Sequence, residues 1–175
     1  MPSEDTSIRL IDVRDADAVA THLARDVQEF ARWEPAQPAG YYTPEGQRTR
    51  IERLLDGHSN GRLWPGVVLA GGLVIGQVTV SEIVRGPFRK GSVGYWVAST
   101  FQKQGHASRA VGLVLQVMAE ELELHRAEAS TQVENLPSQR VLRSNGFASF
   151  GIAHSHIFVG GAWRDGVLWE RILDQ

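Results

Sequence analysis

The chain has 175 residues, of which 42% are hydrophobic and 22% charged, and its formal net charge is −2 at pH 7. This length and composition are typical of one folded domain with a sizeable core, and the small net charge argues against a dedicated nucleic-acid-binding protein. The chain contains no cysteine, which excludes disulfides, thiolate metal sites and a cysteine acyl-enzyme.

The first residues contain no basic segment followed by an apolar one, and no apolar run approaches the roughly 20 residues that a membrane helix needs. The sequence therefore predicts neither a signal peptide nor a membrane-spanning segment. We expect a soluble, cytoplasmic protein without a membrane partner.

The N-terminal part predicts a strand and a helix. Apolar residues alternate over 7–13, as in a strand, and an apolar stripe over 16–30 is typical of a helix. Asp15 or Asp17 stands where a helix cap is expected. Residues 33–46 are rich in Pro, Gly and aromatic side chains, which indicates a loop.

A second helix and a β-hairpin follow. Thr43 and Pro44 form a cap-and-proline helix start, and Gly57 marks the end of that helix. Gly71 and Gly72 favour a primed turn between two strands. The remaining predicted elements are strands over 63–70, 73–84 and 92–98, a helix over 107–124, a strand over 126–133, a helix over 136–146, and strands over 147–159 and 166–173 around a turn over 160–165.

The order of these elements predicts a mixed α/β sheet in a single domain that spans residues 1–175. A strand, a long helix and a strand in the middle of the chain form a βαβ crossover, which favours parallel pairing there and antiparallel hairpins elsewhere.

Residues 101–107, FQKQGHA, join a predicted strand to the helix over 107–124. The first turn of a helix has unpaired N–H groups and partial positive charge, and the small Gly105 and Ala107 leave room for a phosphate. Lys103 adds a positive charge. The stretch indicates a phosphate site; a tight turn that only starts a helix is the alternative.

Other site motifs fail on their spacing. The stretch FRKGS has its lysine before the glycine, unlike a P-loop, and neither G-x-G-x-x-G nor G-x-S-x-G occurs. His154 and His156 share one side of a strand without further ligands at a recognisable spacing, so we expect no metal site.

The six residues from Gln102 to Ala107 match the Q/R-x-x-G-x-G/A signature of the GNAT N-acetyltransferases. GYWV precedes this signature, and N-x-x-S, an arginine and NGF follow it, before GAWRDG and a last strand. Together, residues 74–173 resemble the RimJ/RimL-type branch, which acetylates the α-amino groups of ribosomal proteins and many other amines. The resemblance implies a splayed central sheet of about seven strands flanked by about four helices.

Two positions depart from that pattern. Ser108-Arg109-Ala110 stands where the family often has Thr-Glu-Ala, and Asp165-Gly166 where it often has Asp-His. The roles of that acid and that histidine are therefore not carried over to this chain.

The resemblance implies that acetyl-CoA is the acetyl donor. Main-chain groups of Trp96, Val97 and Ala98 would pair with the pantetheine arm, and one N–H would polarise the thioester carbonyl; a fully paired strand is the alternative. The other residues implied in coenzyme binding are Gln102, Lys103, Gln104, Gly105, His106, Ala107, Ser108, Asn135 and Arg140.

For catalysis, Asn135 would hold the coenzyme arm or a water, and Ser138 could donate a proton or hydrogen bond to the leaving sulfur. Both residues would also serve as ordinary helix caps. Glu82 is the first candidate base, because alternation puts it on the side of Val78 and Val80, where desolvation would raise its pKa; an exposed strand glutamate is the alternative.

The aromatic loop would cover the acceptor. Trp33, Glu34, Tyr41 and Tyr42 are the candidate acceptor-binding residues, and Glu34 is also a second candidate base. A small hydrophobic cluster under the loop would explain the aromatics equally well.

We therefore expect an acetyl-CoA-dependent N-acetyltransferase that transfers directly in a ternary complex to a protein N-terminal amine. A small-molecule amine is the alternative acceptor, and a non-catalytic coenzyme-binding module is the alternative class. We expect a monomer or a homodimer, with the closing strands as a possible pairing edge.

Overall fold

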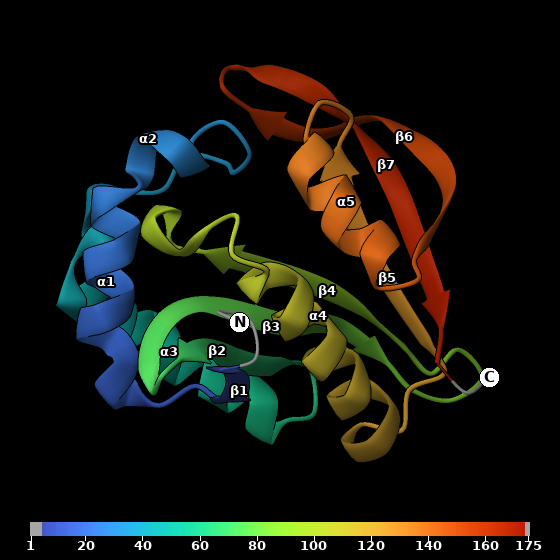
Figure 1. Ribbon diagram of the computed structural model, residues 1–175, viewed down its shortest axis with the longest axis horizontal. Coiled ribbons are helices and arrows are strands. Elements are labelled where there is room, and N and C mark those ends of the chain that lie inside the picture. Colours follow the sequence, from blue (N-terminus) through green and yellow to red (C-terminus); the bar gives the residue numbers. More distant parts are fainter. Residues whose placement is uncertain (1–4, 174–175) are drawn as a thin grey trace.

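The computed structural model describes residues 5–173, which form a seven-stranded mixed sheet with helices packed against it (Figure 1). The strands, in the spatial order β1-β2-β3-β4-β5-β7-β6, are β1 (Thr6–Leu10), β2 (Trp64–Ala70), β3 (Leu73–Val84), β4 (Lys90–Val97), β5 (Arg126–Gln132), β6 (Ala148–Val159) and β7 (Ala162–Ile172). The α-helices are α1 (Ala16–Arg25), α2 (Val27–Phe30), α3 (Pro44–Ser59), α4 (His106–Gln116) and α5 (Leu136–Ser144). The predicted mixed α/β sheet of seven strands is confirmed.

The sheet splits in its middle. All neighbouring strands are antiparallel except β4 and β5, which pair in parallel. That pairing joins only Lys90 to Arg126, Gly91 to Ala127 and Ser92 to Glu128. Figure 1 shows the two strands meeting at one end and separating toward α2 and α5. The βαβ crossover is as predicted, and the remainder of β4 has no strand partner on this side.

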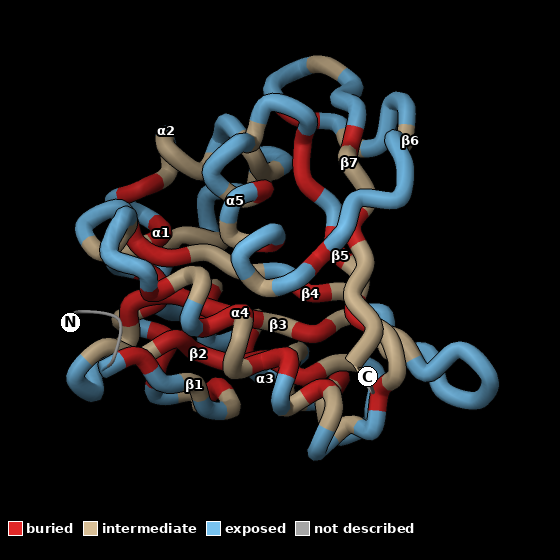
Figure 2. Tube along the Cα trace, turned by 45° about the vertical axis from the view of Figure 1, so that its right-hand side comes forward, coloured by how far each residue is buried: buried red, intermediate tan, exposed pale blue. Residues whose placement is uncertain are grey.

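The two faces of the β1–β4 half are covered by different helices. Each face of this half has its own hydrophobic core. Successive side chains of a strand point to opposite faces, so neighbouring residues of β2 belong to different cores. Val68 packs in the larger core with residues of α4, and Val67 packs with Ile51 of α3 and Ala16 of α1. Buried residues concentrate in this half, whereas β6, at the far edge of the sheet, is largely exposed (Figure 2).

The β2–β3 turn confirms the predicted hairpin, but the far end of β3 does not follow simple alternation. Gly71 and Gly72 both have positive φ, as a primed turn requires. The register then slips between Ser81 and Val84, where Glu82 adopts a φ of 51°. Because of this bulge, Ile83 packs toward the core and Glu82 is exposed. The expected burial of Glu82 beside the strand's valines is wrong.

Three elements differ from the sequence prediction. The closing turn contains only Gly160 and Gly161, both with positive φ, and β7 already begins at Ala162. The apolar stripe over 16–30 is divided into α1 and α2 by Asp26. The helix predicted over 107–124 begins as α4 and ends in a π-helical turn, η5 (Val117–Glu121).

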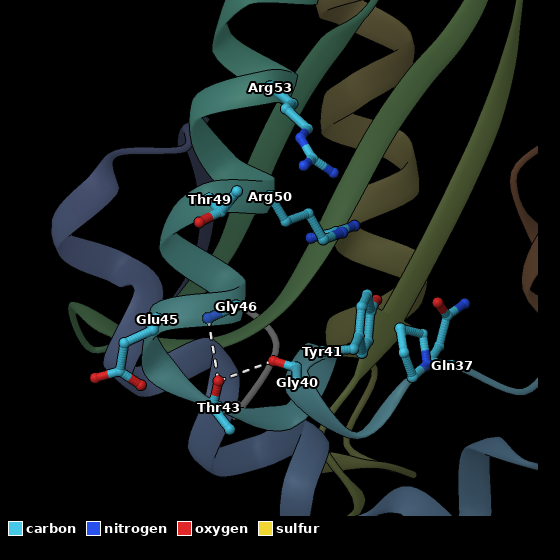
Figure 3. A pocket seen from close by; sticks show the side chains of 10 residues that line it. Gln37, Gly40, Tyr41, Thr43, Glu45, Gly46, Thr49, Arg50 and Arg53 are labelled. Atoms are coloured by element: carbon cyan, nitrogen blue, oxygen red, sulfur yellow. Dashed lines mark hydrogen bonds between the residues drawn. The ribbon is translucent and has the colours of Figure 1, made fainter.

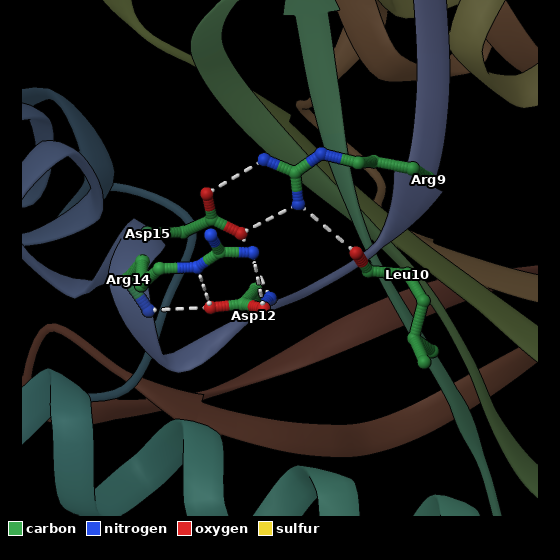
Figure 4. Close-up of polar contacts among 5 residues, drawn as sticks. All are labelled: Arg9, Leu10, Asp12, Arg14 and Asp15. Carbon is green, nitrogen blue, oxygen red and sulfur yellow. Dashed lines mark hydrogen bonds and ion pairs between the residues drawn. The ribbon is translucent and has the colours of Figure 1, made fainter.

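The connection from β1 to α1 is held by carboxylates (Figure 4). Asp12 caps a short 3₁₀ turn, η2 (Val13–Asp15), by accepting from Arg14 N at 2.8 Å. Asp15 occupies the N-cap of α1 without a side-chain cap bond, because its carboxylate accepts two hydrogen bonds from Arg9, at 2.7 and 2.8 Å. Asp15 therefore holds the predicted N-cap position of α1 without capping it through its side chain, and Asp12 caps η2 only.

Asp26 ties the α1–α2 junction to the end of β4. Its carboxylate accepts hydrogen bonds from the N–H and the hydroxyl of Ser99, both at 2.7 Å, and from Arg25 Nε at 3.0 Å. Burial alone would raise the pKa of Asp26, but these hydrogen bonds lower it to about 2 from an ordinary 3.8. The charged form is therefore part of the fold.

No helix within residues 5–173 is both long enough and apolar enough to cross a membrane.

Replacing Asp26 with Ala should cost about 2 kcal/mol of unfolding free energy at pH 7, because it leaves the Ser99 N–H without its charged partner. A carboxyl whose pKa is lowered in the folded state stabilises that state at pH values above its unfolded-state pKa. The difference in unfolding free energy between the wild type and the variant should therefore shrink as the pH falls from about 4 toward about 2. Urea unfolding of the wild type and the variant across this pH range measures both effects. Asp17→Ala on the exposed side of α1 is the matched control, expected within about 0.5 kcal/mol of the wild type; an equal loss in both variants would contradict the account.

Candidate functional site

A cavity of about 550 Å³ opens where β4 has left β5. We call it the main cavity. Its walls come from the segment around α2, the end of β4, the start of α4 and the start of α5, and its lining residues are Glu29, Phe30, Arg32, Trp33, Glu34, Tyr95, Trp96, Val97, Phe101, Gln102, Lys103, Gly105, His106, Ala107, Ser108, Asn135, Pro137, Ser138, Arg140 and Val141.

One end of the main cavity is the N-terminus of α4. Gly105 is its N-cap residue and has a left-handed φ of 86°, and no side chain caps the helix. Lys103, with a φ of 60°, and Gly105 are exposed at this end. The N–H groups of the first turn have no partner within a helix and carry partial positive charge, so this end can receive an anion.

The signature residues divide between the cavity and the scaffold. The His106 ring is buried, with Nδ1 2.8 Å from Thr6 Oγ1, so its side chain joins α4 to β1. Gln102 Nε2 donates to Val97 O at 3.0 Å, and Gln104 Nε2 donates to Thr100 O at 3.1 Å. Of these, Gln104 does not line the main cavity.

The end of β4 offers main-chain groups to the cavity. The N–H of Ala98 donates to Ile75 O at 2.8 Å, and its carbonyl accepts from Phe101 N at 2.8 Å. Since successive residues of a strand direct their main-chain groups to alternate sides, Val97 and Tyr95 direct theirs toward the side that β5 has left. Ala98 and, by the same alternation, Trp96 direct their main-chain groups toward β3, contrary to the sequence prediction, and Val97 is placed to offer its N–H.

Tyr95 and Ser138 meet across the cavity. Their side-chain oxygens are 2.7 Å apart, and the Tyr95 hydroxyl lies 3.2 Å from the Ser138 carbonyl oxygen. Burial raises the pKa of Tyr95 to about 12, although the hydrogen bond to Ser138 opposes this rise. The phenol therefore stays protonated at neutral pH and can donate a hydrogen bond to Ser138. Sequence reasoning missed Tyr95, although its place two residues before Val97 put both on one side of the strand.

Of the two caps predicted at the start of α5, Asn135 is present. Asn135 is the N-cap residue, and its Oδ1 accepts from Ser138 N at 3.2 Å. This bond fixes Ser138 at the cavity wall, and Arg140, two residues further along α5, is exposed and also lines the cavity. Cap and cavity positions therefore coexist in Asn135, whereas Ser138 lines the cavity and does not cap the helix.

The aromatic segment is fixed to the far half of the sheet. Gln132 Nε2, at the end of β5, donates to Trp33 O at 2.9 Å. Phe30 packs edge-on against Trp96, with ring centroids 5.5 Å apart. Neither Gln132 nor Phe30 was a predicted site residue. Both hold the α2 segment across the gap between β4 and β5.

Glu34 is the carboxylate that this segment brings to the main cavity. Burial raises its pKa, and the positive charge of Arg50 opposes that rise. No hydrogen bond from the described residues contributes to its pKa. Glu82 does not line the cavity, Tyr41 lines a different one, and Tyr42 lines neither.

Within residues 5–173, no group of three or more His, Asp or Glu side chains is arranged to hold a metal ion. His154 Nδ1 instead lies 3.0 Å from Asp165 Oδ2 in the exposed β6–β7 hairpin. A bulge with Ser155 at a φ of 48° interrupts the strand between the two predicted histidines.

The model of the "Acetyltransferase (GNAT) domain" family matches residues 7–148. The chain belongs to the GNAT acetyltransferase family. Among curated GNAT relatives, "Probable N-acetyltransferase YjcK" of Bacillus subtilis (strain 168) is 32% identical over 163 residues, which cover 90% of this chain and 88% of that protein.

Solved GNAT structures have the same fold. A ribosomal-protein-S5-alanine acetyltransferase from Vibrio fischeri superposes with a TM-score of 0.92 at 34% identity, over 98% of this chain and 94% of that one. Mycobacterium smegmatis RimJ, solved in complex with CoA-disulfide, superposes with a TM-score of 0.93 at 30% identity, over 97% and 84% of the two chains. The resemblance to RimJ/RimL-type acetyltransferases is confirmed.

Proposed function

We propose that this protein transfers an acetyl group from acetyl-CoA to the α-amino group of a protein or peptide N-terminus, by direct attack in a ternary complex. The observation that carries the proposal is one cavity that joins the uncapped start of α4, the Tyr95–Ser138 pair and Glu34. The similarity to a ribosomal-protein-S5-alanine acetyltransferase and to a RimJ solved with CoA-disulfide supports both the donor and the acceptor class.

The chain's residues fit the phosphates of the coenzyme. The first-turn N–H groups of α4 would hold the pyrophosphate, with Gly105 leaving the main chain accessible. Lys103 and Arg140 line the same cavity and add two positive charges. Arg109, which replaces the acid often found in the family, is exposed and outside the cavity lining, so it does not obstruct this seat.

The open side of β4 fits the pantetheine arm. An extended chain that contains amides can pair with the free side of a strand. Beyond Ser92, β4 has no strand neighbour on the side opposite β3. We assign the Val97 N–H to the thioester carbonyl oxygen, where a positioned donor stabilises the charge that develops during attack.

Transfer requires a neutral amine and a protonated leaving thiolate. The amine nitrogen attacks the thioester carbon, the C–S bond breaks, and the amine loses one proton while the thiolate gains one. Glu34 would accept the amine proton, directly or through a water. Ser138 would protonate the sulfur and take a proton in turn from Tyr95, whose pKa of about 12 keeps it in the acid form at neutral pH before transfer. Tyr95 would then regain a proton from solvent, to which Glu34 releases the proton taken from the amine.

Acetyl-CoA at 100 times its Kd should stabilise the wild type by roughly 2.7 kcal/mol, and Gly105→Glu should abolish most of this gain. The substitution places an anion and a side chain at the proposed phosphate seat. The measurement is thermal unfolding of each protein with and without acetyl-CoA, each compared with its own ligand-free state.

Gly61→Glu is the matched control, because Gly61 also has a positive φ (68°) and lies outside the main cavity with open space around it. It should keep the full ligand-induced shift despite similar backbone strain. The absence of a ligand-induced shift in the wild type, or equal shifts in all three proteins, would contradict the proposed coenzyme-binding site.

Glu34→Gln should lower kcat/KM for N-terminal peptides by about 100-fold, the usual scale for loss of a general base. Glu82→Gln should leave it near the wild-type value, because Glu82 is exposed at the β3 bulge. Steady-state acetylation of one peptide by both variants measures the difference. The opposite ranking would restore Glu82 as the base, and no loss in either variant would mean that water alone accepts the proton.

A further inference from the structure

A second cavity, of about 820 Å³, lies beside the first, between the start of α3 and the segment before it. Figure 3 shows Arg50 and Arg53 extending from α3 on the side of Tyr41 and Gln37, while Glu45 points the other way. Residues three apart on a helix share a face, so both guanidinium groups serve the same opening. The function proposed above does not use this cavity.

Arg50 is held in place by neutral groups. Its Nη1 lies 3.1 Å from Gln77 Oε1 and 3.3 Å from Gln47 Oε1, and its guanidinium carbon lies 5.6 Å from the centre of the Tyr41 ring. Gln47 and Gln77 are 0% and 2% exposed. A half-buried charge fixed by buried amides is preorganised for a ligand at little cost in side-chain entropy.

Neither arginine is neutralised by a close partner. Among residues 5–173, no carboxylate lies within 4 Å of Arg50 or Arg53. Arg48, on another side of the same helix, does pair with a carboxylate, that of Asp17 at 3.7 Å. The second cavity therefore presents two positive charges that the fold leaves without an ion pair.

One buried side chain, that of Gln77, connects a residue of the second cavity to a residue of the main cavity. Gln77 Oε1 accepts from Arg50 at 3.1 Å and from Trp96 Nε1 at 3.2 Å, and Trp96 lines the main cavity. The positive charge of Arg50 lowers the pKa of Glu34, and the negative charge of Glu34 raises the pKa of Tyr41, in each case as a smaller effect than burial, so the three side chains lie near one another. A ligand that reaches from Glu34 past Tyr41 would meet the arginines.

We propose that the second cavity binds a carboxylate of the acceptor, an Asp or Glu side chain near the N-terminus of the acetylated peptide, through Arg50 and Arg53. This inference rests on the function proposed above. Guanidinium groups match carboxylates in geometry as well as charge. With Glu34 drawing the amine and the arginines drawing the acid, an acceptor that carries both charges is oriented before transfer.

The test compares acetylation of peptide pairs that differ only by Glu or Gln at one of positions 2, 3 or 4. The readout is the ratio of kcat/KM for the Glu peptide to that for the Gln peptide, in which general effects of a substitution on the enzyme cancel. At one position the wild-type ratio should be about tenfold or more, the scale of one charge-assisted hydrogen bond.

The ratio should fall toward one in Arg50→Gln and in Arg53→Gln, and Arg50→Lys should recover part of it. Arg48→Gln is the matched control, because it removes the same charge from the same helix outside both cavities, and it should retain the wild-type ratio. In the wild type, a ratio above one that arises mainly from a lower KM for the Glu peptide would agree with binding of its carboxylate.

The outcomes separate the two proposals. A wild-type ratio near one at every position, with the peptides acetylated, would overturn this inference and leave the proposed function standing. An equal fall of the ratio in Arg48→Gln would also overturn it, because long-range charge would then be the cause. Failure to acetylate any peptide, with acetyl-CoA still bound, would overturn the peptide acceptor and this inference with it.

Discussion

The parallel pairing of β4 with β5 is limited to three residue pairs, and the rest of the structure depends on that limit. The joined end is reinforced by charge: Glu128 accepts from Lys90 Nζ and from Arg126 Nε, both at 2.8 Å. Beyond Ser92 the strands separate, so the main-chain groups on one side of β4 have no strand partner. Such groups are costly when buried without partners, which makes this edge a natural place for a ligand that carries amides.

Contacts across the gap keep it open at a defined width. Tyr95 reaches Ser138 on α5, Gln132 reaches the main chain of Trp33, and Asn145 Nδ2 donates to Ser108 O at 3.1 Å. Asp26 anchors the α1–α2 junction to Ser99, two residues beyond the end of β4. The same contacts that hold the halves apart also place the proposed catalytic groups on opposite walls. In this account, stability and function share one set of hydrogen bonds.

Much of the fold could be predicted because local signals agreed with the tertiary structure. Gly71-Gly72 requires a primed turn, Thr43-Pro44 starts a helix, and a strand–helix–strand order requires a parallel crossover. The predictions failed where a distant partner decides the local conformation. Asp26 divides an apolar stripe because it binds Ser99, which lies 73 residues away in the sequence.

The candidate site could likewise be predicted where local sequence signals exist, and not where distant partners decide. Asn135, Ser138 and most of the residues before α4 line one cavity, and a short motif in the sequence contains each of them. Glu82 was misplaced because a bulge has no signal in a run of alternating residues. Tyr95 and Arg50 were missed because their partners, Ser138 and Gln77, lie 43 and 27 residues away.

Amide hydrogen exchange of the wild-type protein with and without saturating acetyl-CoA tests the central claim most directly. The claim is that the coenzyme occupies the gap between β4 and β5. The account predicts slower exchange at Val97 and over residues 105–108, with no change in the exposed β6–β7 hairpin. Protection in the hairpin or on α3, with the end of β4 and the start of α4 unchanged, would contradict it.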